Sequence, residues 1–205
     1  MTTCGAPTDV AGLTAPRTPA ARAALETCTE FAEPWLLRHS LRAYFFAAAY
    51  AERDGIDHDV ELLFVAAMLR DLGLTVPFDS HRLAFEEAGG HLARVFAAGA
   101  GWPANRRERL AEVIVLHMRA PVAAGDAPEA HLLQIAVSAD VSGHGLDAFD
   151  PEFRSALLGR FPRAGFGTEF LRLVQDQAQR KPSSAAANLM HGGWAQRIST
   201  NPLDR

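Results

Sequence analysis

Residues 62–73 read Leu-Leu-Phe-Val-Ala-Ala-Met-Leu-Arg-Asp-Leu-Gly, eight apolar side chains followed directly by a cation and an anion. The apolar run is too short to cross a bilayer, which takes about 20 residues, and its length suits a helix buried in a protein core. Burying the charges of Arg70 and Asp71 is unfavourable unless each has a partner. The stretch therefore predicts a core helix that ends in a paired or functional charge cluster.

The helical pattern continues in both directions along the chain. Apolar residues recur at three- and four-residue spacing, and no alternating segment typical of a strand stands between the turns. We therefore predict an all-α fold. The expected helices cover residues 20–33, 34–53, 58–71, 82–98, 104–118, 129–143, 151–160 and 167–180, with glycines and prolines at many of the breaks.

Length and composition fit one domain with a substantial core, since 48% of the 205 residues are hydrophobic. Residues 1–19 are expected to be a disordered leader, residues 20–185 the helical domain and residues 186–205 a C-terminal tail. The net charge is −4, and the basic residues form no stripe along the sequence. Both observations argue against nucleic acid as a partner. Without a membrane-length apolar segment, a secretory signal or a disulfide pattern, we expect a cytoplasmic protein with no membrane partner.

Polar side chains interrupt the apolar helices at four places, namely His39, the Arg70-Asp71 doublet, His117 and Asp140. Each has an ordinary structural explanation, such as a hydrogen bond to a carbonyl oxygen, a helix cap or an ion pair. Their order along the chain is more informative about the family and its function than any one of these residues alone.

That order resembles the H…HD…D signature of the HD superfamily, whose motif side chains come from separate helices and converge on a divalent metal. Arg70 stands where the signature has its second histidine. The flanking sequence resembles the cyanamide hydratase branch of the superfamily over about residues 35–185. The segments similar to that branch are Arg38–Tyr44, Leu69–Gly73, Phe85–Gly90, Ile114–His117, Gln134–Gly143, Phe161–Gly165 and Lys181–Pro182.

The resemblance implies a helical HD domain in which a zinc-type ion polarises a small nitrile-like substrate and supplies hydroxide. By the same likeness, His39, Asp71 and Asp140 are the ligands if a metal is bound. Arg70 cannot be a ligand, because a guanidinium stays protonated and has no free lone pair. At about 4 Å and an effective dielectric constant of about 20, it would repel a dication by roughly 8 kcal/mol.

The favoured interpretation is therefore an enzyme without a cofactor, in which Arg70 pairs with Asp71 or Asp140 in place of the metal. Arg70, Asp71 and His117 are the predicted catalytic residues, one stabilising negative charge and the others moving a proton. The predicted substrate-binding residues are His39, Asp140, Thr75 and Glu86. The expected chemistry is of the lyase or hydratase type: addition of water to a small nitrogen-containing substrate, or its elimination or rearrangement.

Two alternatives stay open at this point. In one, zinc or iron is retained for a hydrolase or hydratase reaction, Arg70 turns to solvent, and His81, His91 or His117 completes the ligand shell. In the other, the degenerate site belongs to a non-catalytic protein that binds a small molecule. A homo-oligomer is compatible with each of these interpretations.

Overall fold

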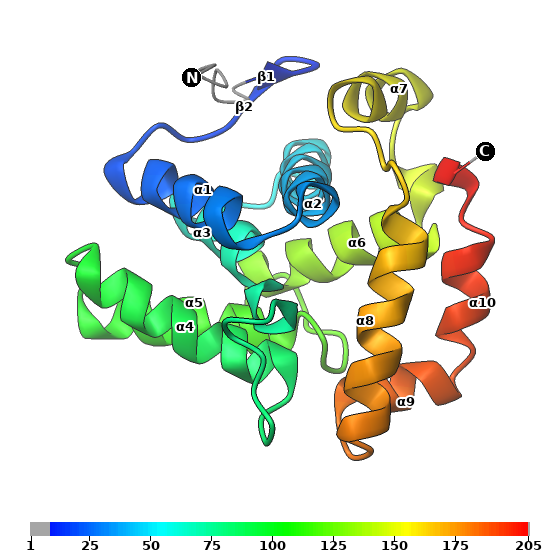
Figure 1. Cartoon of the computed structure of the whole chain (residues 1–205). Coiled ribbons are helices and arrows are strands. Elements are labelled where there is room, and N and C mark those ends of the chain that lie inside the picture. Colours follow the sequence, from blue (N-terminus) through cyan, green and yellow to red (C-terminus); the bar gives the residue numbers. More distant parts are fainter. Residues whose placement is uncertain (1–8, 205) are drawn as a thin grey trace, which may run out of the picture.

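Helix α2, Pro34–Asp54, runs through the middle of the molecule in a computed structural model that describes residues 9–204 (Figure 1). Pro34 is pre-set for the first turn of the helix, and Gly55 ends it in the left-handed conformation at φ 64°. The helix packs along α6, Pro128–Ser142, and brings fully buried Phe45 and Phe46 into the core. This pair of helices carries two of the predicted site residues, His39 and Asp140.

The described residues form ten α-helices, three short 3-10 helices and one two-stranded hairpin. Besides α2 and α6, the elements are β1 (Asp9–Val10), β2 (Leu13–Thr14), α1 (Pro19–Phe31), α3 (Val60–Leu69), η1 (Leu72–Leu74), α4 (Phe85–Gly99), α5 (Ala104–Leu116), η2 (Leu146–Ala148), α7 (Pro151–Arg160), α8 (Phe166–Arg180), α9 (Ala185–His191), α10 (Trp194–Ser199) and η3 (Pro202–Asp204). The predicted all-α fold is confirmed. All eight predicted helices are present, with ends that differ from the expectation by at most three residues.

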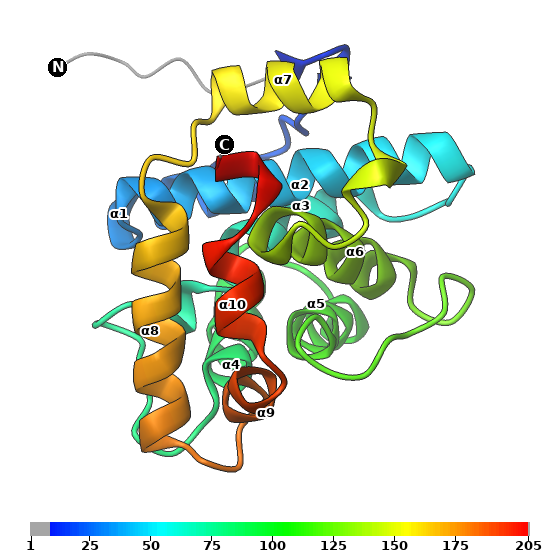
Figure 2. The same ribbon diagram turned by 90° about the vertical axis from the view of Figure 1, so that its right-hand side faces the viewer.

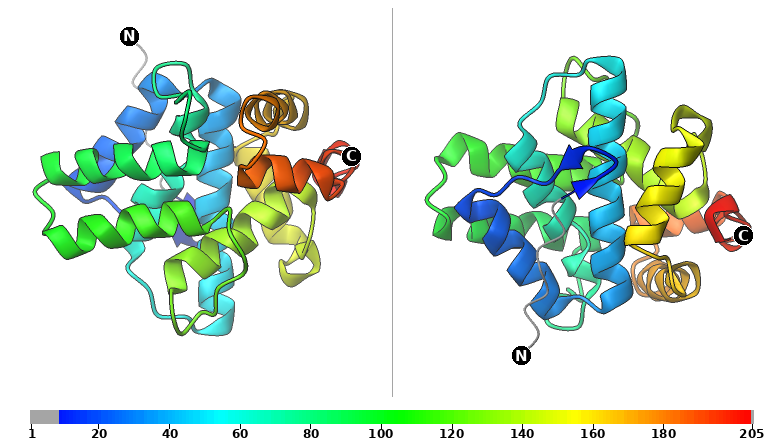
Figure 3. Two further views of the ribbon diagram at one scale, coloured as in Figure 1. Left: turned by 90° about the horizontal axis from the view of Figure 1, so that it is seen from below. Right: turned by 90° about the horizontal axis from the view of Figure 1, so that it is seen from above.

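Helix α3 is the buried apolar helix that the sequence predicts. Its residues 62–69 are all buried, and Asp59 caps its first turn by accepting from the backbone N–H of Leu62. Helices α4 and α5 pack side by side as an antiparallel pair (Figure 3). Two glycines let the start of α4 approach the end of α3, because a Cβ at Gly73 would lie 2.1 Å from the carbonyl oxygen of Phe85 and one at Gly89 would lie 2.6 Å from that of Arg70.

The C-terminal residues form part of the packed structure. Helices α8, α9 and α10 lie together on one side of the molecule (Figure 2), where Trp194 and Ile198 of α10 join a second apolar cluster with Phe166 and Phe170 of α8. In its described part, residues 186–204, the expected C-terminal tail is therefore largely helical and packed. The segment is short and rich in small residues, so its sequence shows little of the apolar periodicity of a helix. Trp194 and Ile198 are nevertheless buried by packing against α8.

The sequence also predicts a disordered leader at residues 1–19, but its described residues, 9–19, are structured. Asp9–Val10 pairs antiparallel with Leu13–Thr14, and the side chains of Val10 and Ala15 are buried in the core. Residues 1–8 of that predicted leader lie outside the described residues. Within residues 9–204, no helix combines the length and apolarity needed to cross a membrane.

Candidate active site

The guanidinium of Arg70 lies between two other predicted site residues. Its Nη2 atom donates to Nε2 of His39 at 2.7 Å and lies 2.9 Å from Oδ2 of Asp71. The neighbouring Nη1 donates to the carbonyl oxygen of Ala67, one turn back in α3. Arg70 and His39 are fully buried, so this part of the cluster is closed to solvent.

Asp140 stands on the opposite edge of the His39 ring. Its Oδ2 lies 2.6 Å from Nδ1 of His39, and both its oxygens accept from Arg42, at 2.8 Å from Nε and 2.9 Å from Nη2. Arg163 adds a contact to Oδ1 at 3.1 Å. Burial raises the pKa of Asp140, but the charge of Arg42 and the hydrogen bond from His39 outweigh it, so that the pKa is well below its usual range.

These contacts assign the tautomer of His39. Arg70 has only N–H donors, so Nε2 of His39 must accept, and the ring proton sits on Nδ1 and is donated to Asp140. The two carboxylates are therefore separated by the imidazole of His39 and the guanidinium of Arg70. Arg70 pairs with Asp71, whereas the charge of Asp140 is balanced by Arg42 and Arg163.

Asp71 is ionised in this setting. Burial raises its pKa, but the charge of Arg70 beside it outweighs this effect and holds the pKa well below the ordinary value. The pair retains unused hydrogen-bonding capacity, because Nε of Arg70 and Oδ2 of Asp71 are buried without a hydrogen-bond partner among the described residues. Asp71 retains 2% exposure, so its carboxylate reaches the edge of accessible space.

His117 faces Asp71 from the end of α5. Its Nδ1–H donates to the carbonyl oxygen of Ile114, which leaves Nε2 as a bare acceptor 3.8 Å from Oδ1 of Asp71. Burial, aided by the charge of Arg70, lowers the pKa of His117 to about 4 against the opposing effect of Asp71. The ring is therefore neutral near pH 7, and two acceptors face each other with no proton between them.

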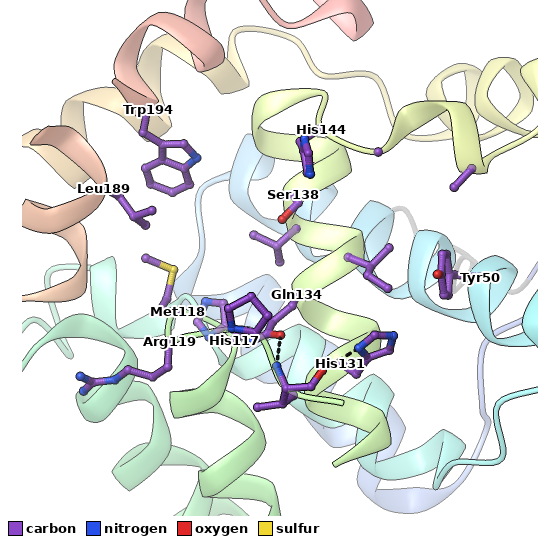
Figure 4. A pocket seen from close by; sticks show the side chains of 16 residues that line it. Tyr50, His117, Met118, Arg119, His131, Gln134, Ser138, His144, Leu189 and Trp194 are labelled. Atoms are coloured by element: carbon purple, nitrogen blue, oxygen red, sulfur yellow. Dashed lines mark hydrogen bonds between the residues drawn. The ribbon is translucent and has the colours of Figure 1, made fainter. Parts of the chain in front are cut away.

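His117 also lines a pocket of about 470 Å³ between α5, α6 and the C-terminal helices (Figure 4). Met118, Leu189 and Trp194 gather beside it, while Ser138 and His144 project from α6 and the turn that follows it. His117 is thus the side chain that belongs both to this pocket and to the buried cluster.

The structure brings together five of the predicted residues, His39, Arg70, Asp71, His117 and Asp140. Thr75 lies elsewhere, where its hydroxyl donates to the carbonyl oxygen of Leu72 at the end of η1. Glu86 is fully buried with both carboxylate oxygens unpartnered by hydrogen bonds among the described residues, 3.7 Å from Arg119. Burial raises its pKa. Neither Thr75 nor Glu86 lines the pocket next to His117.

The histidines considered as spare ligands are placed differently from one another. His81 and His91 are exposed on the surface, because they lie in the loop before α4 and on its outer face. Only His117 of the three faces Asp71. Residues 9–204 contain no group of three or more His, Cys, Asp or Glu side chains arranged to hold a metal ion.

Sequence reasoning missed the two arginines that hold Asp140. Arg42 is fully buried and lies one helical turn after His39 in α2, and Arg163 also binds Asp204 at 2.6 Å. A charged residue within the apolar stretch 41–47 was the available signal for Arg42. Its partner is 98 residues away, so the pairing is visible only in the folded chain.

Comparison with known proteins shows the family to which the chain belongs. The sequence model of the HD domain family matches residues 36–141, which contain all five clustered residues. Cyanamide hydratase DDI2 of Saccharomyces cerevisiae is 28% identical over 159 residues, which cover 75% of this chain and 70% of the relative. Cyanamide hydratase DDI3 of the same organism matches with the same identity and coverage. The predicted HD-superfamily membership, the likeness to cyanamide hydratases and the classification as an enzyme are confirmed.

Proposed function

Because the chain belongs to the HD domain family, we propose that it is a hydratase-type enzyme that adds water to a small nitrogen-containing substrate at a metal-free site. One observation carries the proposal: Nε2 of His117 and Oδ1 of Asp71, both acceptors, lie 3.8 Å apart beside a pocket. The names of the two yeast relatives make cyanamide the first substrate to test.

The donor set does not fit a divalent metal. A metal bound by His39 and Asp71 would approach Nε2 and Oδ2, and a guanidinium nitrogen of Arg70 lies 2.7 Å and 2.9 Å from those two atoms. Asp140 faces the other edge of the ring, where Arg42 and Arg163 already bind it. The cluster therefore has a fixed cation where HD proteins place a metal.

The facing acceptors suit a water molecule. Its two hydrogens can be donated to Nε2 of His117 and Oδ1 of Asp71, with the oxygen about 2.8 Å from each. Both acceptors draw on the water protons, so electron density on the oxygen rises and one lone pair is directed away from them. Asp71 stays ionised and His117 stays neutral near pH 7, so both are ready to accept.

The reaction balances with these groups alone. As the water oxygen bonds to the nitrile carbon, one water proton passes to Nε2 of His117 and an electron pair of the C≡N bond moves to nitrogen. His117 then returns the proton to that nitrogen. The product is the hydroxy-imine tautomer, which rearranges to the amide, or to urea when the substrate is cyanamide.

Arg70 acts here through Asp71. It is fully buried behind the carboxylate, and its charge keeps Asp71 ionised. His39 and Asp140 hold the guanidinium from the far side, since Asp140 fixes the tautomer in which His39 accepts from Arg70. In this proposal Arg70, His39 and Asp140 are positioning residues, whereas His117 and Asp71 touch the reacting water.

The test is urea formation from cyanamide by the purified protein and two isosteric variants. His117→Gln and Asp71→Asn each remove one proton acceptor, and we expect either to lower kcat/KM by about 10²–10⁴-fold. His91→Gln on the exposed face of α4 is the matched control, with activity unchanged. Full activity in either site variant would overturn the proposed roles. Substrate binding without turnover in the wild type would favour the non-catalytic binding protein.

A further inference from the structure

We infer that Asn201, in the turn between α10 and η3, is a positioning residue for the buried cluster, because its amide holds the end of α6 that carries Asp140. This role deepens the proposed function, because it adds a residue that supports the same site. The effect of Asn201 on turnover rests on that function, whereas its effect on the hydrogen bond between Asp140 and His39 does not.

Asp140 lies in the last turn of α6, where the backbone needs partners from outside the helix. The helix ends at Ser142, and Gly143 follows in the left-handed conformation at φ 72°. The backbone hydrogen bonds that close this end run to the carbonyl oxygens of Ala139 and Ser138. Because the last four carbonyls of a helix have no partner within it, the carbonyl of Asp140 depends on other segments.

Two side chains from outside α6 bind the carbonyl oxygen of Asp140. Nδ2 of Asn201 donates to it at 2.9 Å, and Nη1 of Arg163 donates to it from the segment before α8. Asp140 is fully buried, so the loss of a donor is not made good by solvent. Arg163 also binds the carboxylates of Asp140 and Asp204, whereas the amide of Asn201 binds only backbone atoms of the described residues. A change at Asn201 therefore tests the helix end with every charge of the cluster in place.

The amide of Asn201 is fixed in place and in direction. The side chain is buried, and its Oδ1 accepts from the backbone N–H of Leu203 at 2.9 Å. Because the oxygen faces that N–H, the NH2 group faces the carbonyl of Asp140. Helix α10 runs beside α6 and brings the turn to this end of it (Figure 2). The contact is close, since a Cβ at Gly143 would lie 2.6 Å from Cδ of Pro202.

The backbone of Asp140 is linked to the site through the carboxylate of the same residue. Its Oδ2 lies 2.6 Å from Nδ1 of His39, and the proton on Nδ1 leaves Nε2 to accept from Arg70. Terminal turns of helices fray when their carbonyls lack partners, and movement of this turn would carry the carboxylate away from His39. Asn201 therefore acts through Asp140 and His39 on the guanidinium that pairs with Asp71.

Hydrogen exchange at His39 tests this role directly. In NMR of the full chain with isotope-labelled histidine, the Nδ1–H of His39 is identified by nuclear Overhauser contacts with the ring of Phe166, which stacks on it with centroids 4.4 Å apart. Asn201→Leu removes the donor at nearly constant size, and we expect this proton to exchange with solvent at least about tenfold faster than in the wild type. Asn188→Leu, on the exposed side of α9, is the matched control and should leave the rate unchanged.

His117 separates positioning from a general loss of stability. Its Nδ1–H donates to the carbonyl oxygen of Ile114, and the exchange rate of this proton should stay unchanged in Asn201→Leu. Equal acceleration at His39 and His117 would show a general loss of stability and overturn the role of Asn201, as would an unchanged rate at His39. If Asn201→Leu is unfolded by circular dichroism, Asn201→Asp takes its place, because it keeps the acceptor for Leu203 and loses only the donor.

Turnover of cyanamide gives the second measurement. Because Asn201 acts through the helix end and not on the substrate, kcat should fall about tenfold in Asn201→Leu with KM unchanged. Faster exchange at His39 in a protein without hydratase activity would uphold the positioning role and contradict the proposed function. Full kcat in Asn201→Leu, with an active wild type, would overturn the link between Asn201 and the site and leave the proposed function intact.

Discussion

The Nη2 atom of Arg70 lies 2.7 Å from Nε2 of His39, so a protonated nitrogen occupies the edge of the imidazole from which a metal would be bound. This contact links a continuous series of groups, from Asp140 through His39 and Arg70 to Asp71. The carboxylate of Asp71 then faces His117 at the pocket. Arg70, which replaces one histidine of the family signature, thus takes part in the hydrogen bonds and ion pair of the surrounding residues.

Arg70→His should give the protein a zinc site. The change removes the fixed cation and its repulsion of roughly 8 kcal/mol toward a dication. It also adds an imidazole beside His39 and frees the Nε2 lone pair of His39 from its hydrogen bond with Arg70. Competition with a chromophoric chelator should show one tightly bound zinc per chain in this variant.

Arg70→Gln is the matched control, because it removes the charge without adding an imidazole. It should bind zinc more weakly than Arg70→His. If both variants bind zinc equally well or neither binds it, the donors of His39 and Asp71 do not converge as the structure has them.

Arg70→Met should destabilise the fold. It leaves the buried carboxylate of Asp71 without its cation, which costs about 3–5 kcal/mol. Urea unfolding measures the loss, and the double variant with Asp71→Asn should recover a large part of it, since the orphaned charge is then gone. Additive losses in the double variant would mean that the two side chains do not interact.

Stability should fall as the pH drops from about 6.5 to about 4 because of His117. Its folded-state pKa is about 4 and its ordinary value is 6.5, so in this window the unfolded chain takes up a proton that the folded protein refuses. The contribution is about 2 kcal/mol between pH 7 and pH 5. Urea titrations at the two pH values check it, and His117→Gln should flatten the slope by that amount. A wild type and variant with the same slope would place the His117 pKa near its ordinary value.

The two aspartates held by Arg163 should differ sharply in their effect on stability. Asp140→Asn leaves the fully buried Arg42 without its anion and removes one of the two carboxylates that bind Arg163, and we expect a loss of about 3–5 kcal/mol. Asp204→Asn removes a carboxylate that is 39% exposed, and the loss should stay within about 1 kcal/mol. Thermal unfolding compares them, and similar losses would show that Arg42 is not the main partner of Asp140.

The helices and the members of the buried cluster were predictable because they depend on local patterns. The run 62–69 fixed the buried α3, and charges inside apolar helices marked His39, Asp71 and Asp140 before any contact was known. The partners of these charges were not predictable. Whether Arg70 meets Asp71 or Asp140 depends on how α2, α3 and α6 pack, and Asp140 lies about a hundred residues from Arg42.

Contacts in the outer parts of the molecule were likewise not predictable from the sequence. Trp194 becomes a pocket wall because α10 packs against α8, and nothing in the sequence around Gly192 and Gly193 specifies that contact. Thr75 and Glu86 lie in or near segments that resemble cyanamide hydratases, but Thr75 donates to the carbonyl oxygen of Leu72 and Glu86 lies 3.7 Å from Arg119. Gly73 and Gly89 allow α4 to come close to Arg70, but the sequence alone does not predict that approach.

Metal analysis combined with activity tests the central claim most directly. Protein purified without chelators is analysed by mass spectrometry for bound metals and assayed for cyanamide hydration before and after treatment with EDTA. The metal-free site predicts far less than one metal ion per chain and the same activity after EDTA. One zinc or iron per chain, with activity lost on EDTA treatment and restored by that metal, would contradict it.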